Sequence, residues 1–289
     1  MAMAMSLETK VFNETQGAIV LNEYSRPDGP RKFLESRAVQ EDVDYYSAEE
    51  VEELIEEAEE KLAGQLADAA AISVVEGDAL ETALAIQAAR TDDGEQNVLV
   101  LNFACAFMTG GNEAIGKHAL EGELCRRSTV FASISSEEAH PFYDANSDLG
   151  GSLYTNGVLV SPHVEVFREP GYLTMETPVA VSLISSPAPY VVMLKGMTDE
   201  ELFDVLKTRI QGILAVAAQD GYKHLVLGAW GCDSNGNDPA MVARAFREAL
   251  DTPIADATFA NLFTTVAFAI DDTKKGQPNL TAFTDEFGA

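Results

Sequence analysis

Two glycines lie side by side in a loop that follows a strongly apolar run of the sequence. The run covers residues 97–103, the pair is Gly110 and Gly111, and a helical pattern starts near Leu120. Because glycine has no Cβ, backbone amides there can approach a phosphate or sugar closely, and a helix start adds partial positive charge. The loop therefore predicts a diphosphate site, although a Gly-Gly pair after a strand is also an ordinary turn.

A second glycine-bearing loop follows the apolar run 224–229, and Pro239 then suits the first turn of a helix. This loop contains Gly231, Cys232, Asp233, Ser234 and Asn235. Two such loops on adjacent strands would form a cleft for a nucleotide-like ligand. In a third loop Asp78 follows Gly77, and its carboxylate either contacts the ligand or caps the next helix.

These loops require a regular alternation of strands and helices, which begins after residue 70. β-rich runs predict strands over 71–75, 97–103, 179–185, 224–229 and 264–270. Helical spacing predicts helices over 80–90, 120–128, 199–218 and 239–250. Nearly continuous apolar strands are typical of a buried sheet between two helical layers. We expect a three-layer α/β/α fold with a mixed, largely parallel sheet, and a ligand beyond the carboxyl ends of its strands.

The N-terminal part of the chain has a different pattern. We interpret residues 1–68 as a helical extension and residues 69–289 as the α/β domain. The clearest N-terminal helix starts at Ser47, which has the spacing of a capping box with Glu50. Its acidic face is either solvated or a partner surface. The segments 91–96 and 139–151 have the composition of surface loops.

The charge balance excludes several classes of function. The 289 residues include 47 acidic and 19 basic ones, so the net charge is −28. Such a field repels nucleic acids and anionic membranes at long range, and we expect non-specific binding to neither. A polyanion would have to enter a local, preorganised pocket. The acidity suits a high-salt cytoplasm, where screening reduces self-repulsion, as well as an ordinary acidic protein.

Cysteine and histidine usage points to no cofactor or metal. Cys105, Cys125 and Cys232 have wide spacings that argue against a disulfide framework or structural zinc, and the four histidines lack metal-ligand spacing. The apolar surroundings of Cys105 and Cys125 predict buried, unreactive thiols. No basic leader or long apolar segment is present, so we expect a cytoplasmic protein without membrane contact.

Several short motifs occur in one order over nearly the whole chain. They are Asn13-Glu14-Thr15, Asn102-Phe103-Ala104, Leu124-Cys125-Arg126-Arg127-Ser128, Tyr154-Thr155, Ser161-Pro162, Val166-Phe167-Arg168, Ser186-Pro187-Ala188-Pro189, Leu227-Gly228-Ala229-Trp230-Gly231-Cys232 and Asn237-Asp238-Pro239. With the Gly-Gly loop, they resemble the bacterial-type poly(ADP-ribose) glycohydrolase family, a branch of the macrodomain fold. The resemblance implies a crevice for ADP-ribose or a related nucleotide. It assigns ligand contacts to Asp78, which would face adenine, and to Asn102, Gly110, Gly111, Asn112 and residues 231–235.

The sequence departs from the family pattern where the catalytic carboxylate belongs. The family has three glycines followed by Gln-Glu-Glu, whereas this chain has Asn112 at the third glycine and Leu120-Glu121-Gly122 at the other three positions. In the family the second Glu protonates the departing ribose oxygen and then assists water at the oxocarbenium-like sugar. Glycine cannot donate a proton, so we expect nucleotide binding with lost or strongly reduced glycohydrolase activity.

A second departure lies in the loop after Trp230. Asp233-Ser234-Asn235 replaces the family's Gly-Val-Phe, which puts a negative charge where the diphosphate should lie and weakens its binding. Met108 stands where the family usually has Asn. Trp230 and Phe167 are core or crevice-wall residues in this interpretation.

Two alternatives stay open. In the first, Glu121 or Glu123 supplies the carboxylate of an active ADP-ribosyl glycohydrolase, although successive helix residues point about 100° apart. In the second, the chain is a non-catalytic scaffold whose crevice is filled by Met108, Asn112 and Asn235.

Overall fold

The computed structural model describes residues 6–26, 29–34, 42–90, 96–111 and 119–288. Within these ranges seven strands form one mixed sheet in the order β3-β6-β7-β5-β8-β11-β4. The parallel strands are β7 (Thr174–Ser186), β5 (Leu99–Phe103), β8 (His224–Leu227), β11 (Thr265–Ile270) and β4 (Ala71–Glu76). The antiparallel edge consists of β6 (Val158–Arg168) and β3 (Asp44–Tyr46).

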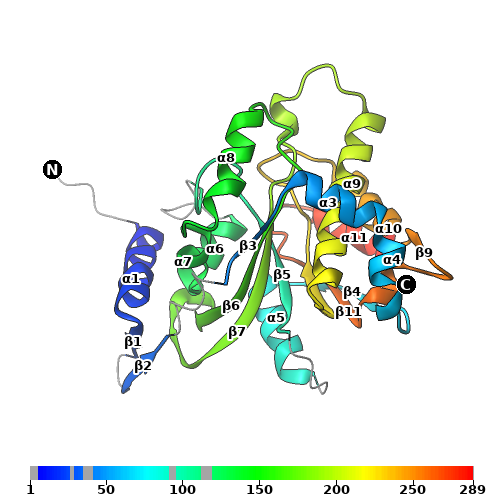
Figure 1. Cartoon of the computed structure of the whole chain (residues 1–289). Helices are drawn as coiled ribbons and strands as arrows, with labels where there is room; N and C mark the ends of the chain where they lie inside the picture. The colour runs from blue at the N-terminus through cyan, green and yellow to red at the C-terminus, as the bar shows by residue number, and fades with distance from the viewer. Residues whose placement is uncertain (1–5, 27–28, 35–41, 91–95, 112–118, 289) are drawn as a thin grey trace.

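Helices cover both faces of this sheet (Figure 1). One layer contains α3 (Ala48–Glu56), α4 (Ala58–Leu62), α9 (Asp199–Gln219), α10 (Pro239–Leu250) and α11 (Pro278–Phe287). The other contains α5 (Ala79–Ala89), α6 (Leu120–Arg127), α7 (Val130–Ile134) and α8 (His140–Leu149). The expected three-layer α/β/α architecture is therefore confirmed.

The apolar run of β5 explains how the sheet is buried on both sides. Leu99 and Leu101 belong to the core under α9 and α10, whereas Val98 and Val100 belong to the core under α5 and α6. Successive side chains of a strand point to opposite faces, so a continuous apolar run supplies both cores.

The N-terminal region contains helices together with short strands. Helix α1 (Leu7–Leu21) is followed by the hairpin of β1 (Glu23–Ser25) and β2 (Arg31–Phe33), and β3 joins the edge of the main sheet. At the start of α3 both hydrogen bonds of the Ser47–Glu50 capping box are present, as predicted. The strand β3, which lies before residue 68, contributes to the main sheet. The division of the chain at residue 68 stays a prediction.

The remaining short elements connect the larger ones. They are β9 (Pro253–Ile254), β10 (Ala257–Thr258) and the 3₁₀ turns Ala63–Gln65, Pro170–Tyr172, Val191–Met193 and Phe259–Leu262. None of the helices in the described ranges combines the length and apolar character that crossing a membrane requires.

Two segments differ from the sequence-based expectation. The predicted surface loop 139–151 contains α8, in which Phe142 and Asn146 are the buried residues, so its mostly polar pattern concealed a helix. The prediction missed β6, because Pro162 interrupts the run and the pairing shifts register between Ser161 and Val164. The predicted loop 91–96 lies almost entirely outside the described residues.

Helix α9 approaches α3 so closely that one position between them requires glycine. A Cβ on Gly212 would lie 2.4 Å from Cγ1 of Val51, which is buried and β-branched.

We expect Gly212→Ala to lower the free energy of unfolding by about 1–2 kcal/mol, because overpacking outweighs the gain in helix propensity. Chemical denaturation would measure this. Gly17→Ala in α1 is the matched control, since its Cβ would meet nothing within 4 Å. Equal stability of the two variants would contradict the packing argument.

Candidate functional site

A cavity of about 780 Å³ lies beyond the carboxyl ends of the parallel strands. Its wall includes Asp78 after β4, Phe103 at the end of β5, Gly231 after β8 and Ile270 at the end of β11. These strands are neighbours in the sheet, so their ends bring together loops that are distant in the sequence. The position agrees with the rule that ligands of open α/β sheets bind at this edge.

The predicted contact residues divide into two groups around this cavity. Those that line it are Asp78, Gly231, Asp233, Ser234 and Asn235. Those described by the structure that do not line it are Asn102, Gly110, Gly111, Glu121 and Cys232. Asn112 lies outside the described residues.

Gly231 fixes the contact between two of the cavity loops. Its φ is +74°, and a Cβ there would lie 2.4 Å from Cβ of Ala188 and 2.6 Å from Nδ2 of Asn237. That same Asn237 amide donates hydrogen bonds to the carbonyls of Pro189 (2.9 Å) and Gly231 (3.0 Å). The loop after β8 is thereby fastened to the loop after β7.

Asp233 pairs with a cation within the protein, and the weakening of diphosphate binding by its carboxylate stays a prediction. Its Oδ1 lies 2.6 Å from Nζ of Lys274 and accepts a hydrogen bond from Asn279 Nδ2 at 3.1 Å. The hydrogen bond to Asp233 raises the pKa of Lys274. The nearby cation reduces the repulsion that a diphosphate would meet. Both side chains are partly exposed, so solvent screening makes this reduction small.

Glu121 is buried and does not line the cavity. Its side chain accepts hydrogen bonds from Asn102 Nδ2 (3.3 Å) and from the backbone N–H of Cys105 (3.1 Å), and the residue is 2% exposed. Asn102 also donates to Ser185 Oγ at 3.0 Å. Glu121 and Asn102 therefore hold the start of α6 against β5 and β7.

Glu123 is the carboxylate of α6 that lines the cavity. It accepts hydrogen bonds from Arg126 Nη2 at 2.6 Å and from the hydroxyl of Tyr172 at 2.8 Å. Arg126 Nε also donates to the Tyr172 oxygen at 3.1 Å. Burial, followed by the hydrogen bond to Glu123, raises the pKa of Tyr172. The Tyr172 hydroxyl is therefore a hydrogen-bond donor at neutral pH.

The N-terminal Asn-Glu-Thr motif supports this part of the wall from behind. Thr15 of α1 donates to the carbonyl of Arg126 at 2.7 Å and accepts from Arg168 Nε at 3.1 Å. Arg168 in turn donates to the carbonyl of Tyr172 at 2.9 Å. The motif thus holds the end of α6 and the β6–β7 connection together.

Asp78 caps the next helix, which is one of the two roles that the sequence left open, and its contact with a ligand stays a prediction. Its carboxylate caps α5 by accepting from the backbone N–H of Glu81 at 2.8 Å, and the residue also lines the cavity. In addition, Nη1 of Arg127 lies 2.8 Å from each of its two oxygens. Arg127 lines the same end of the cavity.

The other side chains singled out from the sequence are mostly structural. Trp230 is fully buried and donates from Nε1 to the carbonyl of Ser186 at 2.9 Å. Cys125 is buried, and burial raises the pKa of its thiol, whereas Cys105 is only partly buried, contrary to expectation. Met108 is 46% exposed and does not line the cavity. It therefore does not fill the crevice as the scaffold alternative requires.

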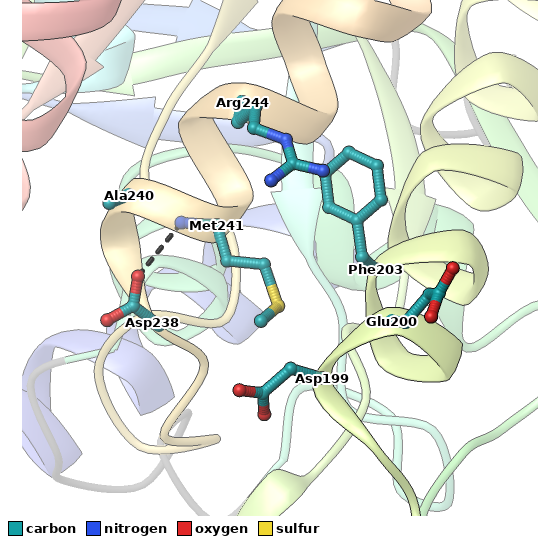
Figure 2. Close-up of a pocket in the computed structure, with 7 residues that line it drawn as sticks. All are labelled: Asp199, Glu200, Phe203, Asp238, Ala240, Met241 and Arg244. Carbon is teal, nitrogen blue, oxygen red and sulfur yellow. Dashed lines mark hydrogen bonds between the residues drawn. The ribbon is translucent and has the colours of Figure 1, made fainter.

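A second hollow lies between the first turns of α9 and α10 and has a different character. Figure 2 shows the carboxylates of Asp199, Glu200 and Asp238 there, with the guanidinium of Arg244 over the ring of Phe203, 3.9 Å from its centroid. Three carboxylates beside one cation oppose a diphosphate. Within the described ranges, no cluster of three or more His, Cys, Asp or Glu side chains could hold a metal ion.

Sequence reasoning missed Tyr172 and Lys274. Both lie in loops without a recognisable motif, Tyr172 between β6 and β7 and Lys274 between β11 and α11. Only the strand order brings these loops to the cavity, so no local signal could have indicated them.

The seven-stranded mixed sheet and the cleft at its parallel strand ends define a macrodomain-like α/β fold. A family model described as microbial-type PARG, catalytic domain, matches residues 13–169. The chain therefore belongs to the microbial-type poly(ADP-ribose) glycohydrolase family.

Solved structures agree with this assignment. Poly(ADP-ribose) glycohydrolase from Thermomonospora curvata is 32% identical, with a TM-score of 0.87 over 97% of this chain and 99% of that one. The Deinococcus radiodurans enzyme in complex with ADP-ribose is 32% identical, with a TM-score of 0.77 over 88% and 98%. A search of curated proteins finds no match.

The close contact at Gly231 generates a stability prediction. We expect Gly231→Ala to lower the free energy of unfolding by more than about 2 kcal/mol, because the strain of positive φ adds to a clash with Ala188. Gly196→Ala is the matched control: its φ is +78°, but its Cβ would meet nothing within 4 Å. It should cost only about 1–2 kcal/mol. Urea unfolding measures both, and equal losses would show that the clash has no effect.

Proposed function

We propose that this chain binds ADP-ribose or a related nucleotide in the cavity at the strand ends, with lost or strongly reduced glycohydrolase activity. Membership of the family and the complexes of its relatives with ADP-ribose support the ligand class. The cavity volume of about 780 Å³ falls in the usual range for small-molecule sites. No cofactor enters the proposal.

The reduced activity rests on one observation, the distribution of carboxylates along α6. Gly122 separates Glu121, which is buried against Asn102, from Glu123, which is bonded to Arg126 and Tyr172. Hydrolysis of a glycosidic bond needs a proton donor at the leaving oxygen. Glu121 is buried and does not line the cavity, and Glu123 accepts hydrogen bonds rather than donating one, so neither is arranged as that donor.

Restoring the missing carboxylate tests the proposal. We expect Gly122→Glu to raise the rate of ADP-ribose release from poly(ADP-ribose) by about 10² to 10⁴-fold, the usual contribution of a general acid. Gly122→Ala is the control, because it changes the backbone in the same way without adding a carboxylate. A wild-type rate equal to that of the Thermomonospora enzyme under the same conditions would contradict the loss of activity.

Ligand binding is measured separately from turnover, by calorimetric titration of the wild-type protein with ADP-ribose. A ligand that binds the native state must also raise the unfolding temperature by mass action. Absence of both signals at millimolar ADP-ribose would refute nucleotide binding and favour the scaffold alternative.

A second candidate is an active ADP-ribosyl glycohydrolase that uses Glu123. The observation that favours it is that Glu123 lines the cavity while Arg126 and Tyr172 hold its carboxylate in place. A fixed carboxylate can stabilise positive charge at an anomeric carbon and can orient a water molecule. Such an enzyme would need the departing oxygen to be protonated by water or by another group.

This candidate predicts a specific pattern of mutant activity. If Glu123 acts, Glu123→Gln should lower any measured turnover by at least about 10²-fold with little change in the dissociation constant of ADP-ribose. Glu121→Gln is the matched control on the same helix, one residue before Gly122. Equal turnover of the wild type and Glu123→Gln would exclude this candidate.

A further inference from the structure

Two loops at the mouth of the cavity expose large apolar side chains to solvent. The loop after β5 exposes Phe107 and Met108, which are 47% and 46% exposed, and the turn after β7 exposes Val192 and Met193. None of the four is among the described residues that line the cavity. Exposed apolar side chains that lie together indicate a binding surface.

The segment between α8 and β6 connects the two loops into one surface. The ring of Phe107 packs edge to face on the ring of Tyr154, with the ring centroids 5.3 Å apart and the planes at 80°. The backbone N–H of Tyr190 donates to the carbonyl of Ser152 at 2.7 Å, and that of Met193 donates to the carbonyl of Tyr190 at 3.1 Å. We call Phe107 and Tyr154 the rim platform.

A buried arginine fixes the backbone of Tyr154. Nη2 of Arg209 donates to the Tyr154 carbonyl at 3.1 Å, Nη1 donates to the carbonyl of Pro187 at 2.8 Å, and Nε donates to Oδ1 of Asn156 at 3.1 Å. The φ of Tyr154 is +64°, a conformation that residues other than glycine rarely adopt. Such strain persists only where the surrounding structure enforces it, and it is typical of functional sites. The platform is therefore held in place before a ligand arrives.

The rim platform lies next to the cavity. Ala104 lines the cavity and is three residues before Phe107, so the two Cα atoms are at most about 11 Å apart. Ala188 and Asn235 also line it, and the backbone N–H of Val191 donates to the carbonyl of Asn235 at 2.9 Å. A group that is joined to a ligand in the cavity can therefore reach the platform.

The charge of the platform segments suits an anionic ligand. Residues 103–111, 150–157 and 187–198 contain no Asp or Glu, although the chain has 47 of them, and Lys195 is their one charged residue. The net charge of −28 repels polyanions at long range. A ligand with several diphosphates meets less repulsion along these segments than over the glutamate-rich helix α3.

We propose that Phe107 and Tyr154 form a second nucleotide subsite, on which the base of the adjoining unit stacks when the protein binds an oligomer of ADP-ribose. The inference rests on the proposed nucleotide-binding function and extends it from one unit to a linked pair. The terminal unit occupies the cavity, and the next base stacks on the exposed ring of Phe107. Every base has a π-face, so stacking adds affinity without reading the edge of the base.

Calorimetric titration tests the subsite by comparing ADP-ribose with its dimer, in which a ribose–ribose bond joins two units. The wild type should bind the dimer at least about tenfold more tightly than the monomer. Phe107→Ala should reduce this advantage at least about fivefold, because one base–aromatic stack is lost, and should change the dissociation constant of the monomer less than about twofold. Chromatography after each titration shows whether the dimer is intact. If the dimer is cleaved, its KM replaces its dissociation constant in the same comparison.

Three further variants separate base stacking from a general apolar contact. Phe107→Tyr keeps an aromatic ring and should keep the advantage of the dimer, whereas Phe107→Leu keeps an apolar side chain without a π-face and should lose it. Phe33→Ala is the matched control, because Phe33 lies on the β1–β2 hairpin (Figure 1), is 76% exposed and should leave the advantage unchanged. The ratio of the two constants within one variant does not depend on how much of the protein is folded.

Each outcome decides between the claims. Equal affinity of the wild type for monomer and dimer, or an equal advantage in wild type and Phe107→Ala, would overturn the subsite while leaving the proposed function intact. An advantage that survives in Phe107→Leu would also overturn base stacking. Binding of neither ligand to the wild type would instead overturn the proposed function, and this inference with it.

Discussion

Buried guanidinium groups hold together the elements that form the cavity wall. Arg126 and Arg127 are the last two residues of α6, and both side chains are almost completely buried. A buried charge is costly unless it is paired and hydrogen-bonded, so each arginine requires partners from other elements. Arg127 pairs with Asp78 at the start of α5, and Arg126 donates a hydrogen bond to Tyr172 in the β6–β7 connection.

This constraint also accounts for the placement of Glu123. Its carboxylate lies between Arg126 and Tyr172, which hold it at the cavity wall. Glu121, two residues earlier on the same short helix, satisfies Asn102 and the Cys105 amide instead. Two glutamates that are only two residues apart therefore differ in environment: Glu121 is buried, whereas Glu123 lines the cavity. Their spacing on the helix predicts this difference, because it points the two side chains in different directions.

The sequence predicted the parallel part of the sheet well and the antiparallel part poorly. Continuous apolar runs such as residues 97–103 are strong signals because burial on both faces removes the need for polar positions. The strand β6 has Pro162 and a register shift inside it, and α8 has few buried residues, so neither has a clear period. Packing against the rest of the protein decides their structure.

The site was partly predictable for a similar reason. Loops with glycine after a buried strand, such as the one at Gly231, carry a local signal. Tyr172, which lines the cavity, and Lys274, which pairs with the lining residue Asp233, carry no such signal, because only the order of the strands brings their loops there. Lys274 also shows how a chain with a net charge of −28 balances a carboxylate locally, at Asp233, where the net charge alone predicts repulsion.

The place of β4 in the sheet has a consequence for how the molecule assembles during synthesis. In the described sheet its partner is β11, so residues 71–76 must wait for residues 265–270 to leave the ribosome before their backbone groups are paired. Such a long separation in sequence slows closure and leaves an early strand open to wrong partners. Because Asp78 lies two residues after the end of β4, this part of the cavity wall is expected to be among the last parts of the molecule to reach its final form.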